Sequence, residues 1–154
     1  MRLSAFSDYS LRVLMHLGDN TDRLTTIGEI ARLHAISENH LTKVVHQLGR
    51  AGYIETLRGK GGGMRLARAP REITLGEVLR HTETDFALVE CFGQGSRCQI
   101  EPACQLKTIL EEALAALFRV LDGYTLADVL HPTADRATLL ALVDATTRSV
   151  HDQV

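Results

Sequence analysis

Residues 26–50 contain two helix-start signals in close succession, and these signals limit the possible folds of the chain strongly. Thr26 followed by Glu29 forms a capping box, in which the two side chains bind free backbone N–H groups at the start of a helix. Ser37 is a typical N-cap for a second helix. That second helix has apolar residues at helical spacing, namely Leu41, Val44, Val45 and Leu48. Two short helices joined by a tight turn near Ala35 follow the plan of a helix-turn-helix.

The second of these helices has one polar face. The residues outside its apolar stripe are Glu38, Asn39, His40, Lys43, His46, Gln47 and Arg50. A helix that packs by its apolar side presents such groups outward, and it can enter the major groove and bind base edges. We therefore expect double-stranded DNA as a partner. The residues of this helix start that we expect to contact DNA are Ser37, Glu38, Asn39, His40 and Lys43.

The segment after Gly52 predicts a β-hairpin with a glycine-rich tip. Residues 53–57 and 64–66 suit two short strands, and the glycines within 58–63 permit positive φ and close approach of another backbone. The cations expected to bind DNA phosphates here are Arg58, Lys60 and Arg65. A nucleotide-binding loop fails on spacing, because Lys60 is followed by glycine rather than by Ser or Thr. A plain flexible turn would also account for the glycines.

The charge of the chain is divided unevenly. Residues 1–70 carry ten Lys or Arg against six Asp or Glu, whereas residues 71–154 carry seven against thirteen, so that the total is −2. A basic N-terminal part on an acidic protein is typical of a nucleic-acid binder whose second region has another task.

Two broad classes are disfavoured by the sequence. No apolar run approaches the ~18 residues that span a bilayer, and the N-terminus lacks the apolar core of a secretory signal, so we expect a cytoplasmic protein without membrane contact. The seven histidines form no arrangement with the cysteines that suggests a nucleophile and its base. We therefore do not expect an enzyme.

Residues 106–121 predict a long amphipathic helix, for which Pro102 suits the first turn. Its apolar stripe consists of Leu106, Ile109, Leu110, Ala113, Leu114, Leu117 and Leu121. One helix cannot bury this stripe by itself, and two-fold symmetry is common in operator-binding proteins, so we expect a homodimer. Residues 122–124 end the helix, and residues 125–130 predict a short return helix.

These elements predict a mainly α-helical fold with a small β wing, in which a winged helix-turn-helix DNA-binding domain is followed by a long dimerisation helix. Thr74 and Glu77 form another capping box, so a short helix should close the DNA-binding domain. The expected divisions are this domain at 1–80, a cysteine loop at 81–105, the dimerisation and return helices at 106–130, and a C-terminal tail without clear signals at 131–154.

All three cysteines of the chain, Cys91, Cys98 and Cys104, lie in one short segment with the spacing C-x6-C-x5-C. An odd number of cysteines cannot be fully paired within one chain, and a soft metal centre is a natural occupant of three thiolates. Zinc sites favour C-x2-4-C pairs, whereas wider loops suit an iron-sulfur cluster. A redox switch or three unligated cysteines would also be compatible with this spacing. Cys104 is expected in the first turn of the long helix, where the helix dipole favours a thiolate.

Together these motifs resemble one protein family. The helix-turn-helix, residues 48–54, the wing 58–66 and the three-cysteine loop are similar to the iron-sulfur winged-helix repressors over residues 1–130. Segments 6–9, 98–107 and 122–128 look most like the members that sense nitric oxide. The resemblance implies a homodimeric repressor that holds one cluster per subunit and leaves the operators of nitric-oxide detoxification genes when nitric oxide attacks the cluster. A 4Fe-4S cluster is favoured, and a 2Fe-2S cluster is the alternative.

Three cysteines leave one iron of a 4Fe-4S cluster without a thiolate. The family resemblance implies an oxygen ligand from the N-terminal helix of the partner subunit, which falls on Asp8 here. Asp8 could instead be a simple helix cap, and Glu90, Glu101 and His34 are rival ligands. A regulator of the same fold that senses redox state or iron-sulfur supply, or a zinc or thiol switch, also stays open.

Overall fold

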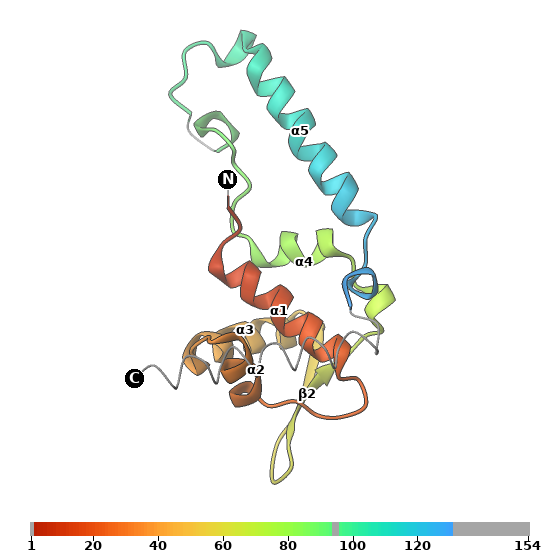
Figure 1. Cartoon of the computed structure of the whole chain (residues 1–154). Coiled ribbons are helices and arrows are strands. Elements are labelled where there is room, and N and C mark those ends of the chain that lie inside the picture. The colour runs from red at the N-terminus through yellow and green to blue at the C-terminus, as the bar shows by residue number, and fades with distance from the viewer. Residues whose placement is uncertain (1, 94–95, 131–154) are drawn as a thin grey trace, which may run out of the picture.

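The computed structural model describes residues 2–93 and 96–130, which form helices and one small hairpin (Figure 1). The tail that we delimited at 131–154 lies outside the described residues. The helices are α1 (Ala5–Asp19), α2 (Ile27–His34), α3 (Glu38–Arg50), α4 (Leu75–Thr82) and α5 (Gln105–Asp122), and the strands are β1 (Ile54–Leu57) and β2 (Gly63–Leu66). This mainly helical architecture with a two-stranded antiparallel sheet confirms the expected fold class.

The helix-turn-helix is formed by α2 and α3, and it packs on α1. The Thr26 hydroxyl accepts a hydrogen bond from the Glu29 N–H at 3.3 Å, and Ser37 caps α3 in the same way through the His40 N–H at 3.3 Å. Ala35 between the helices has φ 53°, a left-handed conformation that turns the chain sharply. The core beneath the motif contains fully buried side chains from all three helices, including Leu14, Ile30, Leu41, Val44 and Leu48.

The N-terminal helix α1 is capped by Ser4 and is fixed to α4. Ser4 caps α1 by accepting a hydrogen bond from the Ser7 N–H at 3.2 Å, so the helix already starts at Ala5. The Ser7 hydroxyl is fully buried and donates to Thr82 of α4 at 2.8 Å. The N-terminus of α1 is therefore fixed to α4.

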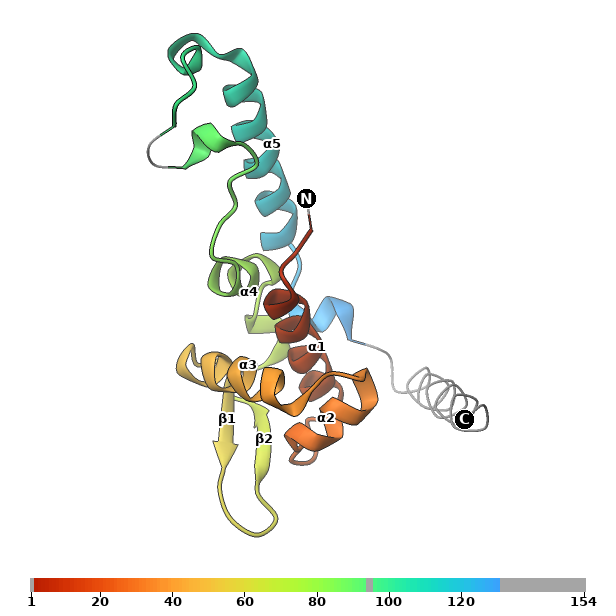
Figure 2. The same cartoon turned by 90° about the vertical axis from the view of Figure 1, so that its left-hand side faces the viewer.

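The wing is an antiparallel hairpin in which Ile54 pairs with Leu66 and Leu57 pairs with Gly63. It is attached to the helix-turn-helix by backbone hydrogen bonds between Thr25 and Met64, at 3.0 and 2.8 Å. Met64 is buried at 2% exposure, so the base of the hairpin belongs to the core. Figure 2 shows the tip projecting away from the core on the side opposite to α5.

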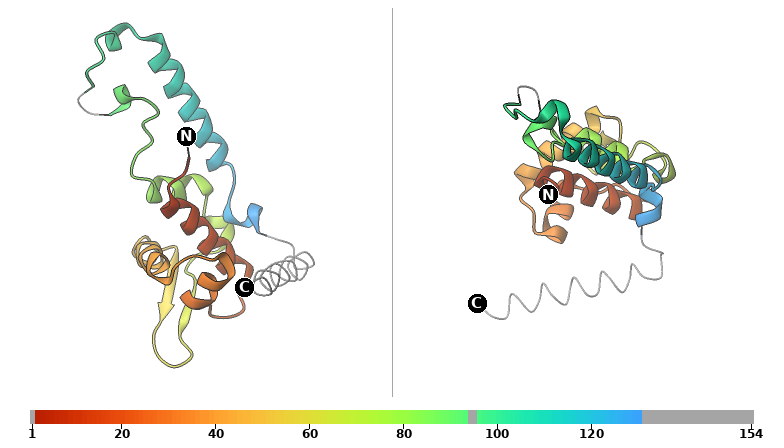
Figure 3. Two further views of the ribbon diagram at one scale, coloured as in Figure 1. Left: turned by 60° about the vertical axis from the view of Figure 1, so that its left-hand side comes forward. Right: turned by 90° about the horizontal axis from the view of Figure 1, so that it is seen from above.

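The long helix α5 extends away from the helix-turn-helix. One side of α4 contacts α1, and α4 also contacts α5. The left view of Figure 3 shows α5 extending beyond the DNA-binding head, which consists of α1–α4 and the wing, while the cysteine-containing segment connects α4 to the far end of α5. No residue of α5 is buried, although the helix has 18 residues.

Two local expectations about this region were wrong. Pro102 lies in a separate 3-10 turn, η3 (Glu101–Ala103), and α5 starts only at Gln105. The extended backbone of Cys104, with φ −83° and ψ 105°, separates the turn from the helix, so Cys104 is the N-cap residue of α5. In contrast, the short return helix expected at 125–130 is present, as the 3-10 helix η4 (Leu126–Val129).

Candidate DNA-binding face and cysteine site

The polar face of α3 is open to its surroundings at the start of the helix. Its exposed residues include all five that the sequence predicts as DNA contacts: Ser37, Glu38, Asn39, His40 and Lys43. The capping bond of Ser37 occupies its oxygen as an acceptor, which leaves the hydroxyl proton free to donate. The His40 ring lies near the ring of Tyr9 of α1, at 6.2 Å between centroids. The face therefore offers donors and acceptors on a rigid helix.

The three cations expected on the wing differ in their surroundings. Arg58 and Lys60 lie at the exposed tip, and within the described residues neither has an ion-pair partner. Arg65 is also exposed, but its guanidinium pairs with Glu55, the residue opposite it in the hairpin. The unpaired positive charge of the wing is thus concentrated at the tip.

A basic hollow of about 700 Å³ lies between the C-terminal half of α3 and the end of α4. It is lined by Thr42, Lys43, His46, Gln47, Arg50, Ala51 and His81. His46 and Arg50 belong to the polar face that the sequence revealed, but we did not predict them as contacts. His81 was missed because its place beside α3 depends on the packing of α4, where its ring meets Tyr53 edge-on at 5.8 Å.

The three cysteines lie in one segment, yet the structure does not bring them to one point. Cys91 is in the 3-10 turn η2 (Glu90–Phe92), Cys98 is in the exposed loop that follows, and Cys104 caps α5; all three are free thiols. In residues 2–93 and 96–130, no three His, Cys, Asp or Glu side chains are grouped so that they could hold a metal ion. A shared centre would require the loop to close further.

The chemistry of these residues nevertheless fits a thiolate-bound cluster. The thiols are accessible, and Cys104 makes no capping hydrogen bond, so the first N–H groups of α5 are left for an anionic group. Lys107 lies nearby and binds Glu101 at 2.6 Å. This hydrogen bond is the main reason that the pKa of Lys107 is raised, and the charge of Cys91 adds to it. The positive charge of Lys107 therefore lies close to the Cys91 thiol.

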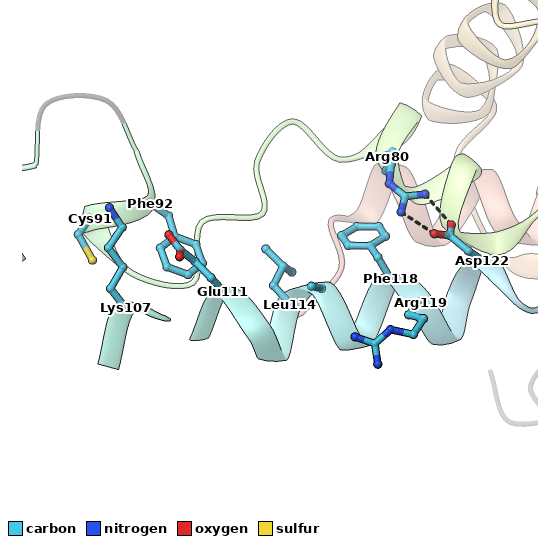
Figure 4. Close-up of a pocket in the computed structure, with 10 residues that line it drawn as sticks. Arg80, Cys91, Phe92, Lys107, Glu111, Leu114, Phe118, Arg119 and Asp122 are labelled. Carbon is cyan, nitrogen blue, oxygen red and sulfur yellow. Dashed lines mark hydrogen bonds and ion pairs between the residues drawn. The ribbon is translucent and has the colours of Figure 1, made fainter. Parts of the chain in front are cut away.

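An open groove of about 660 Å³ runs along α5 from Cys91 to the end of the helix (Figure 4). At one end it is lined by Cys91, Phe92 and Lys107, and at the other end by residues of α4 and α5 that include Arg80, Phe118 and Asp122. The groove thus extends from the cysteine segment to α4, the helix that contacts α1 of the DNA-binding head.

The proposed fourth ligand, Asp8, lies on α1 and is about half exposed, with 45% side-chain exposure. Its carboxylate accepts a bond from Arg12 at 3.0 Å, one turn along the same helix. Glu90 and Glu101 lie in the cysteine segment itself. His34 lies in the head, where burial, the main cause, lowers its pKa and its Nε2 atom has no partner among the described residues.

The exposed polar helix α3, which is the recognition helix of the motif, the basic wing and the helical core define a winged helix-turn-helix regulator that binds DNA. Comparison with protein families gives the same result, because the model of the Rrf2 family, described as "Iron-dependent Transcriptional regulator", matches residues 3–132. The chain therefore belongs to the Rrf2 family of transcriptional regulators. It is a DNA-binding regulator and not an enzyme.

The chain is similar to several curated relatives over most of its length. It is 52% identical to the HTH-type transcriptional regulator NsrR of Bacillus licheniformis, over 84% of this chain and 92% of the relative. It is 48% identical to NsrR of Bacillus subtilis, over 92% of this chain and 99% of the relative.

Solved structures of the family have the same fold. IscR of T. potens matches with a TM-score of 0.68 and 26% identity, over 83% of this chain and 85% of IscR. CymR of B. subtilis, described as a global cysteine regulator, matches with a TM-score of 0.66 and 26% identity, over 84% of this chain and 95% of CymR. In the described part of the present chain, no helix is both long and apolar enough to span a membrane.

Proposed function

We propose that the chain is a cytoplasmic repressor that binds operator DNA as a homodimer and releases it when nitric oxide reacts with an iron-sulfur cluster. The observation that carries this proposal is the presence of three free, accessible thiols in one segment at the start of the long helix. The similarity to NsrR regulators and the description of the family as iron-dependent support it.

The homodimer is supported by the apolar surface of α5. Leu106, Ile109 and Val120 are 59–60% exposed, and none of the 18 residues of this helix is buried. A helix whose apolar stripe lies open is stable when it packs against another surface, and a second copy of α5 offers the same stripe. The proposed roles of the chain segments are DNA binding for 1–80, cluster binding for 81–105 and dimerisation for 106–130.

The cluster would be held by Cys91, Cys98 and Cys104 of one subunit and by Asp8 from its partner. Three thiolates and one carboxylate match four irons, which favours 4Fe-4S over 2Fe-2S. When bound, the cluster supplies iron that reacts with nitric oxide. The chain's own contribution is mechanical: Asp8 lies on α1, which packs against α3, so a bond between Asp8 and the other subunit would fix the recognition helix relative to the dimer axis.

On DNA, the two α3 helices of a dimer would occupy successive major-groove half-sites about 34 Å apart. The exposed start of α3 would contact base edges, while Arg58 and Lys60 of the wing would bind phosphates. A change in the distance or angle between the two heads would weaken both sets of contacts together. Repression of nitric-oxide detoxification genes would then end.

A thiol switch is the second candidate, and one observation favours it. The three thiols are free and do not converge on one point in the described residues. The CymR structure from Staphylococcus aureus, at 26% identity and a TM-score of 0.67, is described as an oxidized form. A regulator with this fold could thus respond to oxidation of a cysteine, with no metal involved.

Anaerobic purification tests the proposal. We expect a brown protein that contains iron and acid-labile sulfide and binds its operator, with Mössbauer spectra that show the cluster type before and after addition of nitric oxide. Operator binding should fall when nitric oxide is added. A colourless protein that binds its operator and loses it on treatment with a thiol oxidant would instead support the thiol switch. Zinc in place of iron and sulfide would contradict both mechanisms.

A further inference from the structure

The long helix and the DNA-binding head are joined through α4. This short helix contacts α1 of the head and also contacts α5. A change in the direction of α5 can therefore reach the head through the α4–α5 contact, through the segment 83–104, or through η4 just beyond α5, which contacts α1. The contact between α4 and α5 has two distinct parts.

The first part is a backbone attachment just beyond the end of α5. The Leu75 N–H donates to the Tyr124 carbonyl at 2.9 Å, and the Leu126 N–H donates to the Ile73 carbonyl at 2.7 Å. Leu126 is buried in the core at 1% exposure. Residues 122–128, whose resemblance to nitric-oxide sensors had no structural explanation, thus anchor the chain after α5. This attachment is a fixed point about which α5 could tilt.

The second part is a forked ion pair between the last turns of the two helices. Nη1 and Nη2 of Arg80 donate to the two carboxylate oxygens of Asp122 at 2.6 and 2.7 Å (Figure 4). The guanidinium also lies over the ring of Phe118, at 4.3 Å from its centroid. A bidentate pair has a defined direction, and the ring below it restricts the guanidinium further. The geometry fixes the angle between the helices as well as their distance.

The first turn of α4 is shaped for this pair. A Cβ atom at Gly76 would lie 1.9 Å from Oδ1 of Asp122, far inside van der Waals contact. Only glycine therefore lets the carboxylate approach α4 so closely. The pair is also connected to the cysteine segment, because the ring of Phe86 meets the Phe118 ring edge-on at 4.7 Å. Contacts thus run from segment 83–104 through Phe118 to Arg80.

We propose that Arg80 is a positioning residue that, through its forked bond to Asp122 over Phe118, sets the angle between the long helix and the DNA-binding head. This inference rests on the proposed function and specifies the path by which the state of the cysteine loop reaches α3. The side chains of Arg80 and Asp122 are 47% and 43% exposed, so their pair can be removed without opening the core. The buried attachment at Leu126 then keeps α5 joined to the head at an undefined angle.

The test compares operator affinity of the cluster-loaded and the cluster-free protein. Their ratio measures the coupling between the two sites, which is commonly 5- to 150-fold in regulated proteins. In Arg80→Gln we expect this ratio to fall at least about fivefold, with iron content and melting temperature close to those of the wild type. Arg80→Lys, which keeps the charge but loses the fork, should retain an intermediate ratio.

Asp122→Asn serves as the second variant, and the double variant with Arg80→Gln should be no worse than either single one, because the two residues act as a pair. Arg119→Gln is the matched control, since this arginine lines the same groove and has no ion-pair partner in the described part of the chain. Its ratio should equal that of the wild type.

Two kinds of result would overturn the inference, and they can be distinguished. If the wild type shows coupling and both Arg80→Gln and Asp122→Asn have the same affinity ratio as the wild type, the ion pair has no role in the coupling, while the proposed function stands. The same holds if both variants weaken the loaded and the cluster-free forms equally, because that result shows only a structural role. A wild-type ratio of one, or a wild type that never binds a cluster, would overturn the proposed function together with the inference.

Discussion

The charge at the wing tip offers a quantitative test of how this protein holds DNA. Lys60 is exposed without an ion-pair partner among the described residues, whereas Arg65 is paired with Glu55 on the opposite strand. A free cation can neutralise a phosphate directly, but a paired cation must first leave its carboxylate. We therefore expect Lys60→Ala to weaken the binding of any DNA duplex more than Arg65→Ala does.

The size of the effect follows from counterion release. Each phosphate that a protein neutralises adds about 0.9 to the slope of log K against log salt concentration. Over a fourfold rise in salt, from ~50 to ~200 mM, one contact then corresponds to a roughly 3.5-fold loss of affinity. The slope for Lys60→Ala should therefore be lower than that of the wild type by about one unit. The slope for Arg65→Ala should change by clearly less.

Fluorescence anisotropy with a selected operator duplex and a scrambled duplex, at several salt concentrations, measures these slopes. Glu55→Gln is the matched control, because it releases Arg65 from its ion pair and should strengthen binding to both duplexes. The reasoning fails if Lys60→Ala has the wild-type slope, or if Arg65→Ala lowers the slope more than Lys60→Ala.

Four further outcomes are expected. Cys98→Ser should lose iron, sulfide and operator binding while it remains a dimer, because serine is a poor ligand for a soft metal. Ile109→Glu should shift the protein to monomers in analytical ultracentrifugation, since a charge would enter the exposed apolar stripe of α5. Asp8→Ala should assemble a cluster on three thiolates, which loses its colour faster in air and supports weaker operator binding. Burial lowers the pKa of His16 below 6.5 in the folded protein, so the unfolded chain takes up the proton first as the pH falls. The stability of the fold should therefore decrease as the pH drops through 6.5 and level off below the folded pKa. His16→Gln should flatten this dependence of the melting temperature on pH.

Matched variants separate these effects from general damage. Thr108→Glu adds the same charge to α5 beside the stripe and should remain dimeric. His46→Gln changes an exposed histidine and should leave the stability profile as in the wild type. Asp22→Ala removes an exposed carboxylate of the head and should retain full operator affinity. If Asp8→Ala matched the wild type in both colour stability and DNA affinity, Asp8 would not be a ligand.

His16 and His34 form a partly buried pair at the contact between α1 and α2. The rings of His16 and His34 meet edge-on at 6.2 Å, and Nε2 of His16 lies 3.7 Å from Glu29. Glu29 is itself paired with Arg23, and this hydrogen bond is the main cause of its lowered pKa. The carboxylate is therefore engaged elsewhere, so burial outweighs its attraction for a proton on His16.

The local elements of the fold followed from the sequence because their signals act over a few residues. Thr26 and Ser37 bind N–H groups three positions along the chain, and the structure contains these bonds. The cap at Thr74 is present as well, at 3.2 Å from the Glu77 N–H. The hairpin followed from two short strand segments on either side of a glycine-rich turn, in which Gly59 and Gly61 have positive φ.

The candidate site was foreseen only in part. The exposure of the α3 start follows from its apolar stripe, since the opposite face of the helix must face outward. The choice of Asp8 rested on family resemblance; Asp8 lies on α1 beside Arg12, and among the described residues of one subunit it belongs to no group that could hold a metal ion. The spacing of Cys91, Cys98 and Cys104 indicates one shared metal centre. Whether the three thiols converge depends on the conformation of the loop between them, for which the sequence contains no strong local signal.

Tertiary structure alone decided which distant side chains meet. Arg80 and Asp122 are 42 positions apart, and their pairing requires both the path of the chain between them and the missing side chain of Gly76. His81 joins the basic hollow of α3 only because α4 packs against the head. Capping and periodicity arise from bonds within one or two helical turns, so sequence reveals them directly. Contacts between elements depend on the sum of many weak packing terms, and these are defined only once the whole core has formed.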